Sequence, residues 1–203
     1  MKTLLTIFFL LIANFDWGIF NKILGYQVGD YARDFKLKNV DGKMVSMADF
    51  KDAKGFIIAF TCNTCPYAIL YESRIINLHN RYISKGYQLI AINPNDAGIQ
   101  PGDSYENMQR RARDKNYPFP YLVDETQEIA RDYGATNTPH LYILKRTGDK
   151  YQVMYIGTID NNPKNPGEAT RHYVDEAMSQ ILDGQPVSEP VTKAIGCGIK
   201  WKI

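Results

Sequence analysis

Two cysteines separated by two residues, in the motif Cys62-Asn63-Thr64-Cys65-Pro66, restrict what this chain can fold into because of what flanks them. Residues 56–60 before the motif are continuously apolar, which is typical of a strand buried on both faces. The residues after it have helical periodicity and predict a helix up to Gly86, with an inward face made of Ile69, Leu70, Ile75, Ile76, Leu78, Tyr82 and Ile83. The motif therefore lies where a buried strand is followed by a helix.

This junction gives the two sulfurs different chemical roles. A cysteine beside the first turn of a helix faces unpaired backbone N–H groups and the positive end of the helix dipole, and both stabilise a thiolate. We therefore expect Cys62 to be the exposed nucleophile, with a lowered pKa. Cys65, one turn further into the helix, is expected to be the resolving thiol that closes a Cys62–Cys65 disulfide. Pro66 suits the first helical turn, where its missing N–H costs nothing.

The alternative interpretations of the motif are two structural cysteines or half of a zinc site. A structural zinc site needs about four ligands. Besides this pair, the chain offers only Cys197 and three scattered histidines, His79, His140 and His172. We therefore expect a redox pair, with no bound metal and no cofactor.

Composition limits the number of domains and the kinds of partner. The chain has 203 residues, of which 44% are hydrophobic and 23% charged, as in one ordinary globular domain with small extensions. Its formal net charge is +2 with acidic and basic residues interspersed, so we expect no binding to nucleic acid or to an anionic membrane surface. We assign residues 26–187 to the domain and residues 188–203 to a C-terminal tail.

Residues 1–25 have the pattern of an export signal. Met1-Lys2 supplies a short basic start, and the nearly all-apolar residues 3–13 match the apolar core of such a signal while being too short to span a membrane. No clear cleavage site follows, so an uncleaved N-terminal anchor and a buried first helix are the alternatives. We expect an exported, periplasmic protein, either soluble or anchored at its N-terminus.

The remaining segments predict an α/β fold. A hairpin with a tight primed turn is expected around Asp41-Gly42, and a buried strand at 89–92 completes a strand, helix, strand unit with parallel pairing. Asp103 and Glu106 resemble a capping box that begins an inserted helix. The later elements are predicted as a strand at 121–123, a helix capped by Thr126 and ended by Gly134, a hairpin of strands 141–144 and 151–156, and a helix at 168–182.

The chain resembles the redoxin branch of the thioredoxin-like superfamily in the order of these elements and in three segments. These are Phe60 to Tyr67 around the cysteines, Thr138-Pro139, and the hairpin leading into Asp49-Phe50-Lys51. The branch is similar to exported bacterial thiol-disulfide oxidoreductases and to peroxiredoxin-like proteins of the alkyl hydroperoxide reductase/thiol-specific antioxidant group. The resemblance implies a thioredoxin-like mixed central sheet flanked by helices, with an N-terminal β-hairpin extension and a helical insertion around residues 94–115.

The resemblance also implies a substrate-binding role for Thr138 and Pro139. In the family, the peptide bond before this proline is cis and the proline faces the disulfide. Proline has no N–H, so the neighbouring backbone, here that of Thr138, binds an incoming extended substrate as an added strand. The family's proline also keeps a metal from bridging the sulfurs.

Several positions depart from the family pattern. Gly55 and Ala59 stand where peroxiredoxins of this branch carry a proline and a threonine, and Phe56 stands where thioredoxin has a buried aspartate. Glu72, on the helix after the motif, is a candidate proton shuttle, the alternative being an exposed helix glutamate. Thr64 replaces a histidine that is frequent in related proteins, which predicts a weaker oxidant.

The preferred hypothesis is a thiol-disulfide oxidoreductase that exchanges the Cys62–Cys65 pair with protein thiols and disulfides, acting as a reductant. Outside the cytoplasm, such a reductant needs a membrane or thioredoxin-type electron donor to reduce it again. One alternative is a peroxiredoxin-like thiol peroxidase, although Gly55 and Ala59 argue against it. Another is a copper-binding metallochaperone that uses the two cysteines and His140, because thiolates and imidazole suit copper.

Cys197 is the odd cysteine, and glycines on both sides give its backbone the freedom to approach another site. As a third redox cysteine it could resolve Cys62 or form an intermolecular disulfide. The favoured interpretation is a small apolar residue packed under neighbouring side chains of the tail, namely Ile195, Ile199 and Trp201. The sequence therefore predicts that Cys197→Ser keeps disulfide reductase turnover within a few-fold of wild type.

Overall fold

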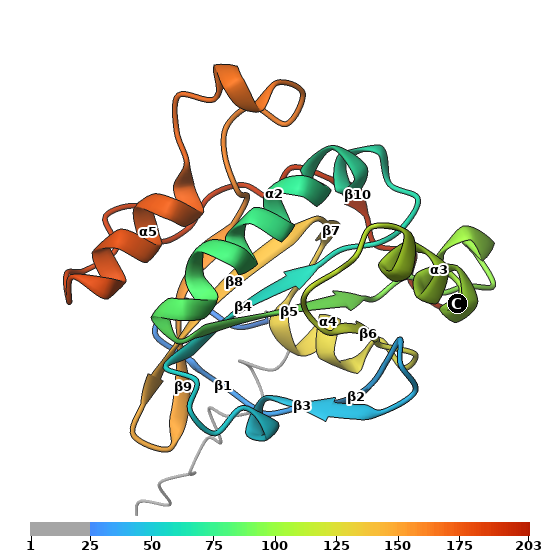
Figure 1. Ribbon diagram of the computed structural model, residues 1–203, viewed down its shortest axis with the longest axis horizontal. Coiled ribbons are helices and arrows are strands. Elements are labelled where there is room, and N and C mark those ends of the chain that lie inside the picture. The colour runs from blue at the N-terminus through green and yellow to red at the C-terminus, as the bar shows by residue number, and fades with distance from the viewer. Residues whose placement is uncertain (1–24) are drawn as a thin grey trace, which may run out of the picture.

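The computed structural model describes residues 25–203, and its centre is an eight-stranded mixed sheet (Figure 1). The sheet consists, in spatial order, of β1 (Tyr31–Ala32), β9 (Lys150–Gly157), β8 (His140–Thr147), β4 (Gly55–Phe60), β5 (Tyr87–Asn93), β6 (Tyr121–Val123), β2 (Lys36–Asn39) and β3 (Met44–Ser46). A second small sheet joins β7 (Asn137–Thr138) to β10 (Cys197–Gly198). The helices are α2 (Pro66–Tyr82), α3 (Tyr105–Asp114), α4 (Glu128–Tyr133) and α5 (Tyr173–Leu182). This architecture confirms the predicted fold class.

β4 lies in the middle of the sheet, and all of its residues are buried. Successive side chains of a strand point to opposite faces. Ile57 and Ala59 join the apolar cluster that contains α2 and α5, whereas Phe56, Ile58 and Phe60 join the cluster that contains α4. The continuous apolar run before the cysteines is thus explained by helices on both faces of the sheet.

The pairing of β4 determines which segments meet at its C-terminal end. β4 is parallel to β5, which confirms the predicted strand, helix, strand unit, and antiparallel to β8. In the second pairing, Phe60 lies opposite His140. Because the cysteine motif follows Phe60 and the Thr138-Pro139 segment precedes His140, the sheet brings these two motifs side by side.

α2 begins at Pro66, as the sequence predicts, but its buried face differs from the predicted one. The buried apolar side chains recur in steps of three and four residues and are Ala68, Tyr71, Ile75, Leu78 and Tyr82. Ile69, Leu70 and Ile83 are 47%, 41% and 40% exposed, so their predicted inward position is wrong. The row of isoleucines lies one residue, or about 100°, around the helix from the buried row. After a 3₁₀ turn, Gly86 ends the helical segment in a left-handed conformation.

The predicted N-terminal hairpin is present, but its turn is not of the primed type. β2 and β3 pair antiparallel, and the Gly42 N–H donates to the Asn39 carbonyl at 2.8 Å. The central residues of this turn are therefore Val40 and Asp41, and neither has a positive φ. Primed turns need a positive φ at the first central residue. Only Gly42, with φ of 88°, takes the left-handed conformation here.

The insertion between β5 and β6 contains a 3₁₀ turn, Pro101–Asp103, followed by α3. The predicted capping box at Asp103 and Glu106 is wrong. Ser104 caps α3 instead, because its hydroxyl accepts the Asn107 N–H at 3.4 Å. The Asp103 carboxylate is left to point towards the cysteine motif.

The starts of the last two helices also differ from prediction. Gln127, in a left-handed conformation, is the residue that directly precedes α4, while the hydroxyl of the predicted cap Thr126 accepts the Glu128 N–H at 3.4 Å. Gly134 ends this helix as predicted. α5 begins at Tyr173 and not at residue 168, because Pro166–Glu168 forms a separate 3₁₀ turn.

The C-terminal tail is folded onto the sheet and helices. After α5 it passes the end of β9, where Val191 forms a bridge with Ile156, and it then pairs with β7 through β10, drawn in red in Figure 1. Beyond β10, the Lys200 N–H donates to the Asn95 side chain at 2.9 Å, in the loop between β5 and α3. The tail therefore passes directly beside the segment that precedes β8.

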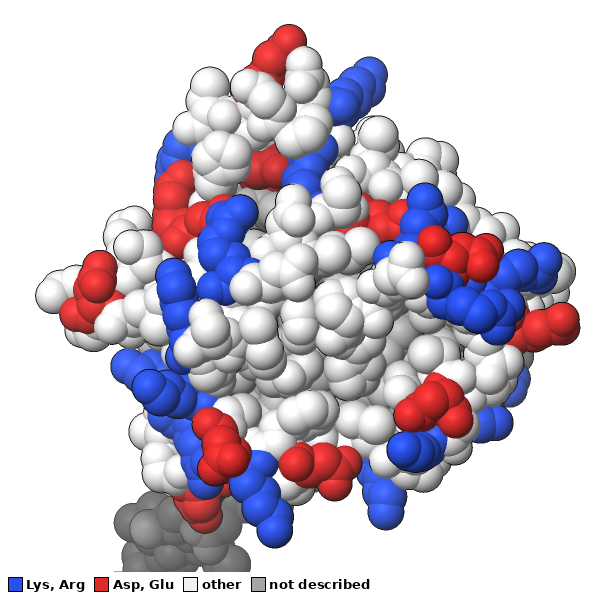
Figure 2. Space-filling view, in the orientation of Figure 1, with Lys and Arg blue, Asp and Glu red and all other residues white. Residues whose placement is uncertain are grey.

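The predicted export signal lies almost wholly outside the described residues, because the description begins at Gly25. From that residue to the C-terminus, no helix has both the length and the apolar character needed to cross a bilayer. On the face seen in Figure 2, acidic and basic side chains are interspersed around the periphery and the central area is uncharged.

A buried ion pair connects α2 to the segment after β9, and its loss should destabilise the fold. Arg74 Nη1 lies 2.6 Å from Asp160 Oδ2, and their side chains are 9% and 2% exposed. Replacing Arg74 by alanine leaves a buried carboxylate without its partner, so we expect Arg74→Ala to lower the free energy of unfolding by about 3–5 kcal/mol. Urea denaturation measures this change.

The matched control is Arg81→Ala, on the same helix. Arg81 pairs with Asp175, but its side chain is 49% exposed. Exposed pairs contribute about 1 kcal/mol or less. Equal losses of stability in the two variants would contradict the importance of burial for the Arg74 pair.

Candidate redox site

The cysteine motif continues directly from β4 into α2. The Thr61 N–H still donates to the Ile92 carbonyl at 2.9 Å, so strand pairing extends to the residue before Cys62. Cys65 is the N-cap residue of α2. Both cysteines are buried, with exposures of 4% and 5%. The prediction that Cys62 is the exposed sulfur is therefore wrong.

Thr138 contacts both cysteines of the motif. Its hydroxyl lies 3.2 Å from Cys62 Sγ, and its carbonyl oxygen lies 3.1 Å from Cys65 Sγ. Thr138 is completely buried, and the peptide bond from Thr138 to Pro139 is cis. The structure thus brings together the two motifs that the sequence singled out, and it has the cis peptide bond that the resemblance implied.

The disulfide of the site joins Cys65 to Cys197, across 132 residues of sequence. Cys62 is the free cysteine. The interpretation of Cys197 as an unpaired, packed residue is therefore wrong, and its partner is Cys65, neither Cys62 nor a second chain. The physical reason is the pairing of β10 with β7, which sets Cys197 directly opposite Thr138.

Asp103, from the insertion, holds the loop between the two motif cysteines. Its Oδ1 accepts the backbone N–H groups of Asn63 and Thr64 at 2.7 and 3.2 Å. Its Oδ2 accepts the Thr64 hydroxyl at 3.1 Å and the Asn95 side-chain amide at 2.7 Å. No local pattern indicates this role, because an aspartate with a glutamate three residues later, here Glu106, is typical of a helix cap.

The pKa of the Cys62 thiol is raised above its ordinary value, in contrast to the prediction. Burial is the largest cause, and the negative charge of Asp103 raises the pKa further. The Thr138 hydroxyl and the N–H groups of Thr64 and Cys65 favour the thiolate without reversing this. The Asp103 carboxylate also accepts the Thr64 N–H, in the loop before α2, and so shares with the Cys62 sulfur one of the donors that lower the pKa.

Glu72, the candidate proton shuttle, is directed towards α3. Its Oε1 accepts the Arg111 Nε–H at 2.6 Å and the Tyr117 hydroxyl at 2.5 Å, and its Oε2 lies 3.6 Å from Lys115 Nζ. Its side chain is buried, with 8% of the residue exposed, so the alternative of an exposed glutamate is wrong. These contacts assign Glu72 a structural ion-pair role, with its hydrogen bonds directed to α3 and Tyr117.

His140, the third ligand of the copper alternative, is buried beside Tyr142. Its Nδ1 accepts the Thr136 N–H at 3.4 Å, and burial lowers its pKa to about 4, which keeps the ring neutral. Within the described range 25–203, no three histidine, cysteine or acidic side chains are grouped so as to hold a metal ion. The geometry therefore gives the copper alternative no support.

With this geometry established, the chain can be compared with known proteins. Residues 28–153 match the AhpC/TSA family. The chain belongs to the AhpC/TSA family. The matched range includes the cysteine motif and Thr138, whereas Cys197 lies beyond it. Membership in the family and the three-cysteine site make this a redox protein of the thiol-disulfide class.

Individual relatives are similar to this chain over most of its length. Thiol-disulfide oxidoreductase ResA from Bacillus cereus is 23% identical over 167 residues, or 81% of this chain and 84% of that protein. The crystal structure of an uncharacterized conserved protein from Geobacillus kaustophilus is 41% identical, with a TM-score of 0.80, and covers 87% of this chain and 93% of that one. A hypothetical protein from Sinorhizobium meliloti is 31% identical, also with a TM-score of 0.80, over 88% and 96% of the two chains.

The charge of Asp103 should govern the reactivity of Cys62. Removing it in Asp103→Asn should lower the pKa of the thiol, so that the midpoint of alkylation against pH moves to lower pH and the rate at neutral pH rises several-fold. Iodoacetamide alkylation of the oxidised protein measures this, because the Cys65–Cys197 bond leaves only Cys62 free to react.

Asp96→Asn is the matched control, since it removes one carboxylate from the same insertion. Asp96 accepts the Ile99 N–H and makes no hydrogen bond to the cysteine loop. Its alkylation profile should equal that of wild type. An unchanged or higher midpoint in Asp103→Asn would show that Asp103 positions the loop without acting on the thiol.

Proposed function

We propose that this protein is a thiol-disulfide oxidoreductase that reduces disulfides of protein substrates, with Cys62 as the nucleophile and Cys65 as the resolving thiol. The observation that carries the proposal is the meeting of both sulfurs at Thr138. A backbone edge that takes an added strand, next to a buried reactive thiol, suits an extended peptide that carries a disulfide. The relationship to ResA, a thiol-disulfide oxidoreductase, supports the same chemistry.

In the reduced protein, the proposed reaction consists of two thiol-disulfide exchange steps. The Cys62 thiolate attacks one sulfur of the substrate disulfide, forms a mixed disulfide and releases the other substrate sulfur as a thiolate. The Cys65 thiolate then attacks Cys62 Sγ, which closes the Cys62–Cys65 bond and releases the reduced substrate. The Thr138 hydroxyl and the N–H groups of Thr64 and Cys65 stabilise the charge on Cys62.

The compartment and the electron donor are parts of this proposal that rest on the sequence. The signal-like pattern of residues 1–25 supports export to the periplasm, with or without an N-terminal anchor. A reductant in an oxidising compartment needs electrons from a membrane or thioredoxin-type donor. Fractionation of cells that produce the full chain tests the location, and recovery of the protein in the cytoplasm would contradict it.

Insulin reduction with dithiothreitol tests the proposed activity. Cys62→Ser should fall to the uncatalysed rate, because Cys62 is the nucleophile of the proposed reaction and its mixed disulfide with the substrate can no longer form. Cys197→Ser is the matched cysteine control and should stay within a few-fold of wild type, since the Cys62 and Cys65 pair is intact. A Cys62→Ser protein as fast as wild type would refute the assignment.

The same protein variants distinguish a disulfide reductase activity from a thiol peroxidase activity. Peroxide consumption coupled to a thioredoxin system should be negligible beside insulin reduction. Ala59 and Gly55, both buried in β4, replace the residues that peroxiredoxins of this branch carry at these positions. Rapid peroxide turnover that requires Cys62 would favour the peroxidase over the reductase.

A further inference from the structure

We propose that the tail strand, residues 195–199, occupies the substrate-binding edge of β7 in the oxidised protein, and that Cys197 is a third redox cysteine that exchanges with Cys62 for a bond to Cys65. This inference deepens the proposed function, because it assigns an occupant to the same edge. It is a feature of this chain's tail, which lies outside the residues matched to the family.

The first observation is the pairing of the tail with β7. Cys197 lies opposite Thr138 and Gly198 opposite Asn137, in an antiparallel ladder. The Ile199 N–H donates to the Thr136 carbonyl at 3.1 Å, and the Asn137 side chain donates to the Gly196 carbonyl at 2.9 Å. An incoming substrate strand needs this same backbone edge, so the tail and the substrate exclude each other.

The second observation is the close fit of Gly196 on the Thr138-Pro139 peptide. A methyl group at Gly196 would overlap the Thr138 carbonyl and stand 2.9 Å from the Pro139 nitrogen. These are backbone atoms, which cannot move aside as a flexible side chain can. Only glycine lets the tail come this close. Gly198, on the other side of Cys197, has open space where its side chain would be.

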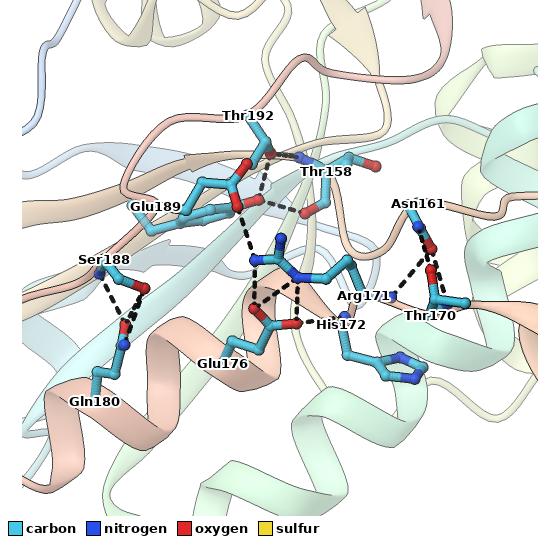
Figure 3. A network of polar contacts seen from close by, with 11 residues as sticks. Thr158, Asn161, Thr170, Arg171, His172, Glu176, Gln180, Ser188, Glu189 and Thr192 are labelled. Carbon is cyan, nitrogen blue, oxygen red and sulfur yellow. Dashed lines mark hydrogen bonds and ion pairs between the residues drawn. The ribbon is translucent and has the colours of Figure 1, made fainter.

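The third observation is that the segments on both sides of the tail strand are hydrogen-bonded to the rest of the domain. Before it, Figure 3 shows Ser188 bonded to Gln180, Glu189 to Arg171 and Thr192 to Thr158. After it, the Lys200 N–H bonds to Asn95 and the Lys202 N–H to Gln127. The anchors keep the tail strand close to β7 even when the covalent bond to Cys65 is broken.

The chemical step is an exchange that leaves the number of disulfides unchanged. The Cys62 thiolate attacks Cys65 Sγ, the Cys62–Cys65 bond forms, the Cys65–Cys197 bond breaks, and Cys197 leaves as a thiolate that takes up a proton. Cys62 and Cys65 share one packed cluster with Ala68, and Cys197 packs against it, so the exchange takes place between neighbouring side chains. In the reverse direction, after a substrate has been reduced, the Cys197 thiolate attacks Cys65 Sγ and Cys62 leaves as a thiolate. The Cys65–Cys197 bond forms again, and the tail strand covers β7.

The position of the disulfide therefore decides access to the site. With the Cys65–Cys197 bond, the tail strand covers the β7 edge and Cys62 is a buried thiol of raised pKa. With the Cys62–Cys65 bond, the tail strand is held by hydrogen bonds alone and a substrate or donor strand can displace it. In the form with the Cys65–Cys197 bond, Cys197 is only partly buried, whereas Cys62 and Cys65 are buried. An incoming donor thiolate therefore reaches the Cys197 sulfur of this disulfide first.

Disulfide mapping of the oxidised protein tests the exchange without any substrate. After acid quenching, alkylation and digestion, wild type should yield mainly the Cys65–Cys197 peptide pair, and Cys197→Ser should yield only Cys62–Cys65. Gly196→Ala keeps all three cysteines but pushes the tail strand away from Thr138. We expect it to raise the ratio of Cys62–Cys65 to Cys65–Cys197 by about tenfold or more, as overpacking against fixed backbone implies.

Gly198→Ala is the matched control and should keep the wild-type ratio. Amide hydrogen exchange of residues 194–202 supplies a second readout, which should show the strongest protection in the oxidised wild type and weaker protection on reduction or in Gly196→Ala. An unchanged disulfide ratio in Gly196→Ala would overturn the proposal, as would equal protection of the tail in oxidised and reduced protein. Neither result depends on insulin reduction, so the proposed activity and this inference can fail separately.

Discussion

Thr138 is the residue on which the geometry of the site depends. Its hydroxyl contacts Cys62, its carbonyl contacts Cys65, and its backbone pairs with Cys197. Thr138 is itself positioned by the pairing of β8 with β4, in which Phe60 lies opposite His140, so that the segment before His140 lies beside the segment after Phe60. All three cysteines therefore lie against this one residue, and the central sheet determines where it is.

The insertion adds electrostatic control to this geometry. A helix N-terminus alone would favour the Cys62 thiolate. Here the Asp103 carboxylate accepts the N–H groups of Asn63 and Thr64, and its charge adds to the effect of burial. Both effects raise the pKa of Cys62, so they favour its protonated thiol over the thiolate beside the Cys65–Cys197 disulfide.

The sequence predicted the parts of the fold that depend on local patterns, and it failed where distant segments decide. The apolar run predicted β4, and Pro66 predicted the start of α2. The family resemblance implied that Thr138 lies opposite the cysteines. The buried row of α2 was not predicted, because isoleucines can lie on either flank of a helix. The partner of Cys65 could not be predicted either, since a two-residue strand such as β10 has no periodicity and Cys197 lies 132 residues away.

That separation has a consequence for the unfolded chain. A cross-link across 132 residues closes a long loop, and it lowers the conformational entropy of the denatured chain far more than a cross-link between neighbouring cysteines does. In the chain-entropy treatment these losses amount to about 5 and about 2 kcal/mol, so a denatured chain with one disulfide favours Cys62–Cys65 by about 3 kcal/mol. The Cys65–Cys197 bond therefore exists because tertiary structure holds its two ends together. Once the protein denatures, the free Cys62 thiol rearranges it to the local pair, and the long-range disulfide is in effect a chemical marker of the native state.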